Sequence, residues 1–389
     1  MALGACGPLL GIEVLSRSDG AQGGDGGPDA SSSSSSSGAD VALVDADASD
    51  ASDAAPDGAG SDGATNAPIT ALVGGYGWIC ALRGTKIACW GRDDGGAVTG
   101  TINASIPMPT SYALPATTTT VYGGTYSLCA LQSDARLTCS GSIGQHVDYA
   151  SMQTAASGVG AAALSSTNAC VRDATGSVRC VGDNGSGQIA GSANGWETAL
   201  VTVRNDDAGV VKVFVADSLT CVATSTRTQC FGSRSSTSLD IINDAVSDLA
   251  VGATHYCYVR GSDSAVMCAG ADNSYGQLGD GSTAPHTTPT RVTLEAAARS
   301  VVSGDGFSCA VLTNGAVWCW GSINTFVNVA GNALSPVKIP SLPAVTMLSI
   351  GDSACAASVG DVYCWGLSST GRLGGAMSRY VPTRITLPP

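Results

Sequence analysis

Along residues 69–389 the apolar residues come in short runs, and each run is bounded by glycine, serine, asparagine, aspartate or proline. Short β-branched and aromatic runs between turn residues are typical of β-strands. The pattern is clearest in residues 300–340. We predict strands at 300–303, 307–312, 317–321 and 336–340, a turn at 304–306 and a hairpin loop at 313–315. The last strand is bounded by prolines, which sheets tolerate at their edges.

This unit recurs seven times, and the cysteines mark each copy. The pairs are Cys80 with Cys89, Cys129 with Cys139, Cys170 with Cys180, Cys221 with Cys230, Cys257 with Cys268, Cys309 with Cys319, and Cys355 with Cys364. The first cysteines of successive pairs lie 36 to 52 residues apart. A glycine stands two residues after every second cysteine: Gly91, Gly141, Gly182, Gly232, Gly270, Gly321 and Gly366. Four short strands in a repeat of this length are typical of a propeller blade.

We therefore predict an all-β fold, a seven-bladed β-propeller of four-stranded antiparallel blades over residues 69–389. Residues 381–387 are expected to form an outer strand of the last repeat, and residues 69–73 an inner strand of the first. If both strands belonged to one blade, the two termini would close the ring, which would remove an open sheet edge.

The spacing within each cysteine pair fits two facing positions of a hairpin, because loop length compensates for even and odd separations. Facing residues in a non-hydrogen-bonded pair lie close enough for a disulfide bond. We predict seven disulfides, one in each repeat. Buried, reduced cysteines are the alternative. Zinc is disfavoured, because no Cys-x₂-Cys spacing occurs and the chain has only three histidines, His146, His255 and His286.

Residues 1–68 differ in composition from the rest. They include the serine run 31–37 and a series of aspartates separated mainly by alanine, serine and glycine, with no aromatic residue. Such a segment cannot bury enough apolar area to offset its ordering entropy, so we expect a disordered, acidic tether. Near its start, the sequence Leu-Gly-Ala-Cys at residues 3–6 resembles a bacterial lipobox, which implies lipid attachment at Cys6, although only two residues precede the motif.

Charge and hydropathy restrict the partners. Residues 1–68 carry eleven acidic residues and one basic residue, so the remainder, with twenty acidic and seventeen basic residues, is nearly neutral. Nucleic-acid binding usually requires a basic surface, so we expect no nucleic-acid partner. No run of 18 apolar residues occurs, and membrane association is expected only through the N-terminal lipid.

Few residues of the sequence suit catalysis. The three histidines lie in different repeats, and neither a Gly-x-Ser-x-Gly nor a P-loop motif occurs. Asp217, Asp305 and Asp352 occupy equivalent positions and would suit a cation, but aspartate beside a turn glycine is more simply a turn residue. We expect His255 to pack against a turn. We predict no enzyme activity, no metal and no cofactor.

The tryptophans fall into two sets. Trp90, Trp320 and Trp365 directly follow the second cysteine of their repeats, and Phe231 is equivalent. Repetition in register indicates packing between blades. Trp78, Trp196 and Trp318 stand outside this register and are the candidates for surface exposure.

Residues 309–321, with Cys-Ala-Val and Gly-Ala-Val-Trp-Cys-Trp-Gly, resemble the repeat of the regulator of chromosome condensation family. Residues 273–281 resemble its second signature through Gly-Gln-Leu-Gly, and 183–189 and 370–374 are weaker copies. The resemblance covers the seven repeats and implies a seven-bladed propeller. Repeats one, two and four lack most of the Gly-Gln-Leu-Gly segment, so irregular blades are expected there.

The function most consistent with these features is a non-catalytic binding scaffold of the bacterial cell envelope, or a secreted one, whose propeller loops contact a protein or glycan. The loops at 191–208 and 322–334 are the expected contact surface. An inhibitor of an extracellular enzyme, known among secreted relatives of this family, is the alternative, and an enzyme that uses acidic residues of one propeller face is a third. The nuclear role of the family, nucleotide exchange on a small GTPase and chromatin binding, does not fit an acidic, cysteine-rich chain. We expect a monomer.

Overall fold

The computed structural model describes residues 67–389, apart from residues 76, 144–146, 190–194, 205–208, 217–218, 233–240, 243, 253, 352, 368–369 and 376–377. The described residues form 28 β-strands. Among them, no helix has the length and apolar character needed to cross a membrane.

The strands form seven sheets, here called blades 1 to 7. Blade 1 contains β1 (Ile69–Gly74), β2 (Trp78–Arg83), β3 (Lys86–Asp93) and β4 (Ala104–Tyr112). Blade 2 contains β5 (Thr118–Gly123), β6 (Ser127–Gln132), β7 (Leu137–Ile143) and β8 (Val147–Ala156). Blade 3 contains β9 (Val159–Leu164), β10 (Asn168–Asp173), β11 (Val178–Asp183) and β12 (Trp196–Arg204). Blade 4 contains β13 (Lys212–Ala216), β14 (Leu219–Ala223), β15 (Thr228–Gly232) and β16 (Ile241–Ile242).

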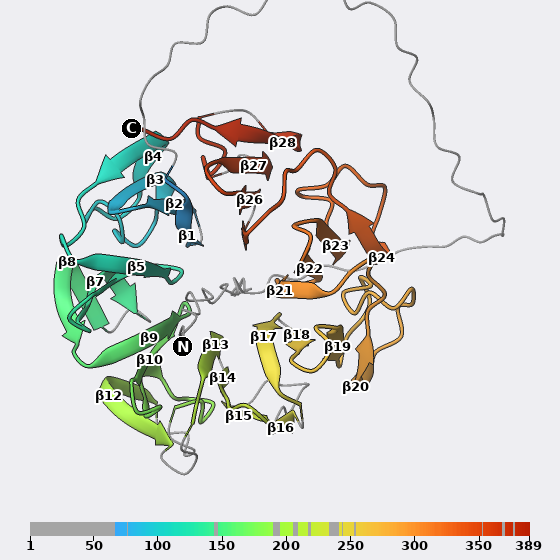
Figure 1. The fold of residues 1–389 in the computed structure, drawn as a ribbon, viewed down its shortest axis with the longest axis horizontal. Helices are drawn as coiled ribbons and strands as arrows, with labels where there is room; N and C mark the ends of the chain where they lie inside the picture. Colours follow the sequence, from blue (N-terminus) through green and yellow to red (C-terminus); the bar gives the residue numbers. More distant parts are fainter. Residues whose placement is uncertain are drawn as a thin grey trace, which may run out of the picture. The chain divides into compact units, whose positions relative to one another are not determined.

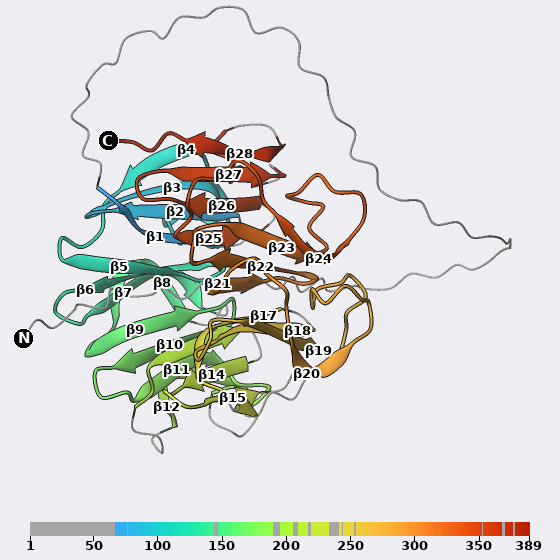
Figure 2. The ribbon, with the colours of Figure 1, turned by 45° about the vertical axis from the view of Figure 1, so that its right-hand side comes forward.

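Blade 5 contains β17 (Val246–Val251), β18 (His255–Arg260), β19 (Val266–Gly270) and β20 (His286–Arg291). Blade 6 contains β21 (Ala298–Ser303), β22 (Phe307–Leu312), β23 (Val317–Gly321) and β24 (Ala333–Lys338). Blade 7 contains β25 (Met347–Ile350), β26 (Ser353–Ala357), β27 (Val362–Gly366) and β28 (Arg379–Ile385). Each blade is an antiparallel meander in chain order, and the blades stand in a ring with the first strand of each nearest the axis (Figures 1 and 2). The predicted seven-bladed, all-β propeller is confirmed.

The two middle strands of each blade form a tight hairpin. In blade 1 Arg83 faces Lys86 across a two-residue loop, in which Gly84 has a φ of 59°. In blade 6 Leu312 and Ala316 flank the three-residue loop 313–315, and Gly315 has a φ of 82°. Both loops have the left-handed residue that short hairpins require. Loop length therefore absorbs the differences in cysteine spacing between repeats, as the sequence predicted.

The glycine two residues after the second cysteine is required by close packing of the backbone. Gly321 has a φ of 89°, where a side chain is strained. A Cβ atom there would lie 2.3 Å from the carbonyl oxygen of Gly306 and 2.8 Å from the Cα atom of Phe307. Gly306, in the turn before the hairpin, accepts a hydrogen bond from the backbone N–H of Ser322. The glycine therefore lets the third strand pass directly over this turn.

The outer strand has a bulge opposite the single residue that lies between the second cysteine and this glycine. In blade 6 Cys319 faces Val337 while Gly321 faces Ala333, so a step of two residues along β23 matches a step of four along β24. The same irregularity occurs in blades 1, 2, 3, 5 and 7. The bulge explains why β24 begins at Ala333 instead of Pro336, because alternation of side chains is lost where residues are added to one strand.

The first repeat starts with an inner strand and the last ends with an outer strand, as expected, but the two strands do not share one blade. β1 to β4 form one complete sheet, and β25 to β28 form another. Every repeat begins with an inner strand and ends with an outer strand, so each blade is made from one stretch of chain. The ring closes by side-chain packing, in which Ile69, Leu72 and Trp90 of blade 1 bury against Leu373 and Ile385 of blade 7. The backbone N–H of Ile69 also donates to the carbonyl oxygen of Val359 at 3.0 Å.

Candidate functional site

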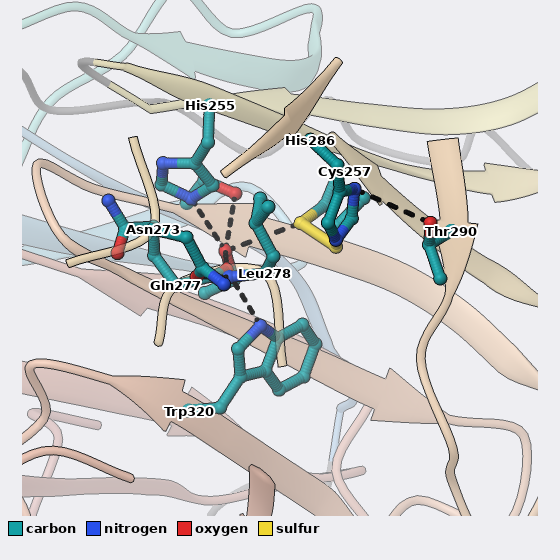
Figure 3. The surroundings of a disulfide bond; sticks show 11 residues. His255, Cys257, Asn273, Gln277, Leu278, His286, Thr290 and Trp320 are labelled. Carbon is teal, nitrogen blue, oxygen red and sulfur yellow. Dashed lines mark hydrogen bonds between the residues drawn. A yellow bond between two sulfur atoms is a disulfide. The ribbon is translucent and has the colours of Figure 1, made fainter. Parts of the chain in front are cut away.

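The joint between blades 5 and 6 shows how neighbouring blades are held (Figure 3). Trp320, directly after Cys319, is fully buried, and its Nε1–H donates to the carbonyl oxygen of Gln277 at 2.9 Å. The hydroxyl of Ser308 donates to the same oxygen at 3.3 Å. Gln277 lies in the loop between β19 and β20, so a loop of one blade receives the tryptophan of the next. This contact explains both the tryptophan after the second cysteine and the Gly-Gln-Leu-Gly loop.

His255 belongs to the same joint. Its side chain is buried, and its Nε2 atom lies 2.8 Å from the hydroxyl oxygen of Ser308. A Cβ atom at Gly252 would lie 2.3 Å from the imidazole Cε1 atom, so the ring packs directly against the turn before β18. This position agrees with the expectation that His255 packs against a turn. The residue links two blades and does not face an accessible surface.

Equivalent contacts recur where the sequence signature is weak. Trp90 Nε1–H donates to the carbonyl oxygen of Arg372 at 2.7 Å, between blades 1 and 7. In blade 2, Ser140 stands in the tryptophan position and donates to the carbonyl oxygen of Ala97 in blade 1. The hydrogen bond between blades is therefore kept without tryptophan, because the serine hydroxyl reaches the equivalent carbonyl oxygen.

The loop of blade 1 also keeps the geometry of the blade 5 loop. In blade 5 the side-chain oxygen of Asn273 accepts the backbone N–H of Leu278 at 3.0 Å. In blade 1 the carboxylate of Asp93 accepts the N–H of Val98 at 3.0 Å. An asparagine and an aspartate perform the same role because both present an acceptor to the backbone. The blade 1 loop is therefore regular, although an irregular blade was expected from the missing Gly-Gln-Leu-Gly segment of repeat one.

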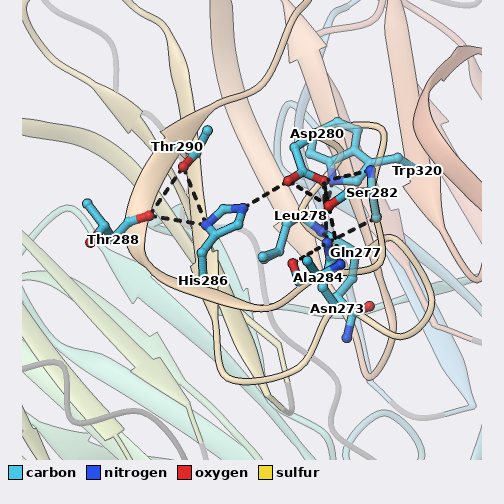
Figure 4. Close-up of polar contacts among 10 residues, drawn as sticks. All are labelled: Asn273, Gln277, Leu278, Asp280, Ser282, Ala284, His286, Thr288, Thr290 and Trp320. Carbon is cyan, nitrogen blue, oxygen red and sulfur yellow. Dashed lines mark hydrogen bonds and ion pairs between the residues drawn. The ribbon is translucent and has the colours of Figure 1, made fainter.

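The blade 5 loop ends in a polar cluster around Asp280 and His286 (Figure 4). His286 Nε2 lies 3.0 Å from an Asp280 carboxylate oxygen, and its Nδ1 lies 3.2 Å from the carbonyl oxygen of Thr288. Both ring nitrogens therefore face acceptors. The hydroxyl and backbone N–H of Ser282 donate to the same carboxylate. Burial raises the pKa of Asp280, but the hydrogen bonds from Ser282 and His286 outweigh it and hold that pKa below its usual range.

This cluster does not have the arrangement of a Ser–His–Asp triad. In a triad the serine hydroxyl donates to the imidazole, whereas Ser282 donates to Asp280. The cluster instead closes the loop that receives Trp320. The pair of Asp280 and His286 is not among the predicted site residues, and its one signal in the sequence is the short separation of the two residues after Gly-Gln-Leu-Gly.

Fourteen cysteines form seven disulfides, each between the two middle strands of one blade. In order from blade 1 to blade 7, the bonds join Cys80 to Cys89, Cys129 to Cys139, Cys170 to Cys180, Cys221 to Cys230, Cys257 to Cys268, Cys309 to Cys319, and Cys355 to Cys364. These are the pairs expected from the sequence.

The disulfides are structural. The paired Cα atoms lie 4.0 or 4.1 Å apart, in directly facing positions. All fourteen side chains are buried, so they hold the blades and do not present reactive thiols. Cys6, the predicted lipid-attachment residue, lies outside the described residues.

The structure describes only one of the three aspartates that were considered as ligands of a cation. Asp305 lies in the turn between β21 and β22, while Asp217 and Asp352 lie outside the described residues. Within the described part of the chain, no group of three histidine, cysteine, aspartate or glutamate side chains has the geometry to hold a metal ion. His146 also lies outside the described residues.

The tryptophans show where sequence register was informative. Trp90, Trp320 and Trp365 are fully buried in the joints between blades, as their register indicated. Trp78, one of the three candidates for surface exposure, is fully buried too. Trp196 is 39% exposed at the start of β12, and Lys338 Nζ lies 5.9 Å from the ring centre of the half-buried Trp318.

The loops proposed as a contact surface are only partly external. Residues 196–204 of the first loop form strand β12. In the second loop Ile323 and Phe326 are fully buried, and they pack with Trp365 in the joint between blades 6 and 7. The polar residues between them are exposed. The second loop is therefore chiefly the blade 6 counterpart of the Gly-Gln-Leu-Gly loop.

One buried carboxylate lies at the inner strands. Asp248 in β17 accepts the backbone N–H of Val301 in β21 at 2.9 Å, which joins blades 5 and 6 near the axis. Burial raises the pKa of Asp248 to about 6, although the Lys212 ammonium and the Val301 N–H act in the opposite direction. Lys212 in blade 4 donates to the carbonyl oxygen of Ser247.

Comparisons with solved structures agree with this architecture. Prp20p from Saccharomyces cerevisiae has a TM-score of 0.65 at 16% identity, with 82% of this chain and 88% of that chain covered. Human WBSCR16 has a TM-score of 0.63 at 16% identity, with 79% and 95% covered. The ectodomain of the Physcomitrella patens receptor kinase CR4 has a TM-score of 0.50 at 17% identity, with 76% and 73% covered. At these identities the likeness establishes the fold.

Two family models describe the repeat itself. Residues 269–311 and residues 298–326 each match the regulator of chromosome condensation (RCC1) repeat. The matches span the loop with Gln277, the hairpin with Cys309 and Cys319, and Trp320, which are the parts that build the joint described above. The remaining blades share its disulfide and strand order. Residues 269–326 therefore consist of regulator of chromosome condensation repeats, and the other blades have the same strand order.

Proposed function

We propose that this chain is a non-catalytic binding scaffold that works in an oxidising, extracytoplasmic compartment and presents its propeller surface to a protein partner. One observation carries the proposal. His255, Ser308 and Asp280 are of residue types that often act in catalysis, but here their hydrogen bonds hold loops and blades together. The rigid framework leaves loops and outer strands available for recognition.

The disulfides support the choice of compartment. Disulfides persist in oxidising compartments and are rare in the cytosol. A reduced form of this propeller would have to bury fourteen thiols in facing pairs. The receptor kinase CR4 carries a similar propeller in its ectodomain, which is compatible with the proposed location.

The N-terminal region completes the proposal. We assign residues 1–68 as a tether and residues 69–389 as the propeller. Lipid attachment at Cys6 would anchor the tether to an envelope membrane and hold the propeller away from it, since the acidic residues 1–68 repel one another. The near-neutral propeller makes nucleic acid an unsuitable partner. Prp20p is described as binding Gsp1p and histones, and we infer protein binding here without transferring those partners.

The outer rim at the junction of blades 1 and 7 is the strongest candidate contact surface. Met108 in β4 is 65% exposed, and Tyr380 and Val381 in β28 are 41% and 62% exposed. We call these three residues the rim patch. β4 and β28 are the outer strands of the neighbouring blades 1 and 7 (Figures 1 and 2). A Cβ atom at Gly375 would lie 3.6 Å from the Met108 Cγ atom, so the chain leading into β28 reaches β4. Exposed apolar groups on the outer strands of neighbouring blades are suited to contact with another protein.

Affinity capture tests the proposal. The full chain, produced with oxidised cysteines, is cross-linked to envelope extract from the source organism, and bound proteins are identified by mass spectrometry. We expect one enriched protein, with recovery at least tenfold lower for the double variant that combines Met108→Ser with Val381→Ser. Val359→Ser is the matched control, because Val359 is 68% exposed in the turn between β26 and β27 and lies outside the rim patch.

The identity of the captured partner separates the remaining functions. An extracellular enzyme whose activity falls on binding would establish the inhibitor function. Retention of polysaccharide alone would establish glycan binding in place of protein binding. Equal recovery by the rim-patch variant and by the wild type would reject this surface, and recovery of no protein or glycan would reject the scaffold proposal.

A further inference from the structure

The joint between blades 2 and 3 lacks the large side chain that fills other joints. Blades 1, 6 and 7 place Trp90, Trp320 and Trp365 after the second cysteine, and all three are fully buried. Blade 3 has Val181 at this position. Because a valine is much smaller than a tryptophan, this joint keeps unfilled space unless its neighbours move inward, and close-packed strands move little.

A cavity of about 270 Å³ lies at this joint. Blade 2 contributes Leu137, Ile143 and Ala156 to its wall, and blade 3 contributes Leu164 and Val181. These residues belong to one apolar cluster that spans the two blades. The cavity is therefore built into the packing between the two sheets and is not a furrow between exposed loops.

The inner strand of blade 3 contributes to the same space. In β9, Ala162 faces this joint and a larger side chain would extend into it, whereas Ala163 packs in the apolar cluster of blades 3 and 4. Ala162 and Leu164 line the cavity, and they also line a smaller hollow of about 30 Å³ formed by the inner strands of blades 2 to 5. Ala162 on the inner strand and Val181 on the third strand are thus the small side chains that face the open volume.

The cavity wall determines the class of ligand. Among the described residues it contains no charged or aromatic side chain, and Thr198 supplies the one hydroxyl group. A buried water molecule requires about two to four polar partners, so this wall does not stabilise bound water. Apolar cavities of about 150 Å³ in proteins are known to stay dry and to accept small apolar molecules. Without aromatic groups there is no face for ring stacking, so an aliphatic ligand is favoured.

The exposed end of the cavity lies at the outer strand of blade 3. Thr198 and Ala199 are exposed, and they stand in the bulge of β12 opposite Val181. A polar group attached to an aliphatic chain could remain in solvent here, beside the Thr198 hydroxyl, while the chain enters the joint. We propose that the joint between blades 2 and 3 is a binding site for a single aliphatic chain of medium length, with its polar end at Thr198.

The proposal is tested with the full, disulfide-bonded chain and with dodecanoate below its micellar concentration. Isothermal titration should show saturable one-to-one binding, and benzoate should bind at least tenfold more weakly. Methyl-labelled protein should give intermolecular nuclear Overhauser contacts between the dodecanoate chain and the methyl groups of Leu164 and Val181. A single-chain phospholipid with the same acyl group distinguishes a lipid source from a free fatty acid: whichever of the two binds identifies the natural class.

Two filling variants provide the structural test. Val181→Trp places in this joint the side chain found in blades 1, 6 and 7, and Ala156→Phe fills the opposite wall. Each folded variant should bind dodecanoate at least tenfold more weakly than the wild type, while Val359→Ser should bind equally well. The wild-type methyl contacts decide the question even if both variants fail to fold. Absence of saturable binding by both ligands, contacts to other methyl groups, or unchanged affinity in a folded filling variant would overturn the proposal.

Discussion

Trp320 in blade 6 and Gln277 in blade 5 are joined by a 2.9 Å hydrogen bond from the indole Nε1–H to the backbone carbonyl oxygen. The two residues come from different repeats and from the two separate signatures of the family. One signature thus supplies the loop between the third and fourth strands of one blade, and the other supplies the side chain of the next blade that packs against this loop. Similar hydrogen bonds from Trp90 and Ser140 to a carbonyl oxygen of the preceding blade hold other neighbouring blades together.

Replacement of Trp320 by phenylalanine should destabilise the propeller. The variant loses the indole hydrogen bond and leaves part of a fully buried site empty, at a cost of about 1–3 kcal/mol in the free energy of unfolding. Urea denaturation followed by circular dichroism measures the loss. Trp196→Phe, at a position 39% exposed, should change the same free energy by less than about 0.5 kcal/mol. Equal effects of the two changes would contradict the role of the joint.

Gly321→Ala should be poorly tolerated because of both conformation and space. The backbone has a φ of 89°, and the new Cβ atom would meet the Gly306 carbonyl oxygen at 2.3 Å. We expect a loss of about 2 kcal/mol or more in the free energy of unfolding. Gly360→Ala is the matched control, since nothing lies within 4 Å of a Cβ atom there. Thermal denaturation of the two variants should give a clearly lower midpoint for Gly321→Ala alone.

Asp248 should make stability depend on pH between about 4 and 6. Its pKa in the folded state is raised to about 6 from the ordinary value of 3.8, so the folded protein binds more protons than the unfolded chain in this interval. Stability therefore falls as the pH rises from about 4 to about 6, by on the order of 3 kcal/mol for this group. Asp248→Asn keeps an acceptor for the Val301 N–H and removes the ionisation. Denaturation at a series of pH values should give a wild-type-minus-variant difference that declines across this interval, and a constant difference would refute the assignment.

Removal of one disulfide should weaken its blade without abolishing the fold. The bond between Cys309 and Cys319 spans 10 positions of sequence. Replacing both cysteines by alanine should cost about 2–3 kcal/mol, because the loop closed in the unfolded state is short. Urea denaturation compares the variant with the wild type. Peptide mapping of the oxidised wild type without reduction should recover the seven pairs within repeats, and pairs between repeats would contradict the structure.

The repeat, its number and the class of fold follow from the amino-acid sequence. Facing cysteines, a glycine two residues later and a turn before each hairpin are local features, and local backbone geometry depends mainly on nearby residues. The cysteine pairs therefore predicted which strands form each hairpin, and register predicted that Trp90, Trp320 and Trp365 are buried. Residues 307–312 and 317–321 became strands with the predicted bounds.

How the blades meet depends on packing in three dimensions. Nothing along the chain pairs Ser140 with Ala97 or indicates that Trp78 is buried, because these outcomes depend on a neighbouring blade distant in sequence. Ring closure depends on packing for the same reason, since the termini pack as complete blades. The cavity beside Val181 also arises from two sheets together, because the volume left at a joint depends on what both faces supply.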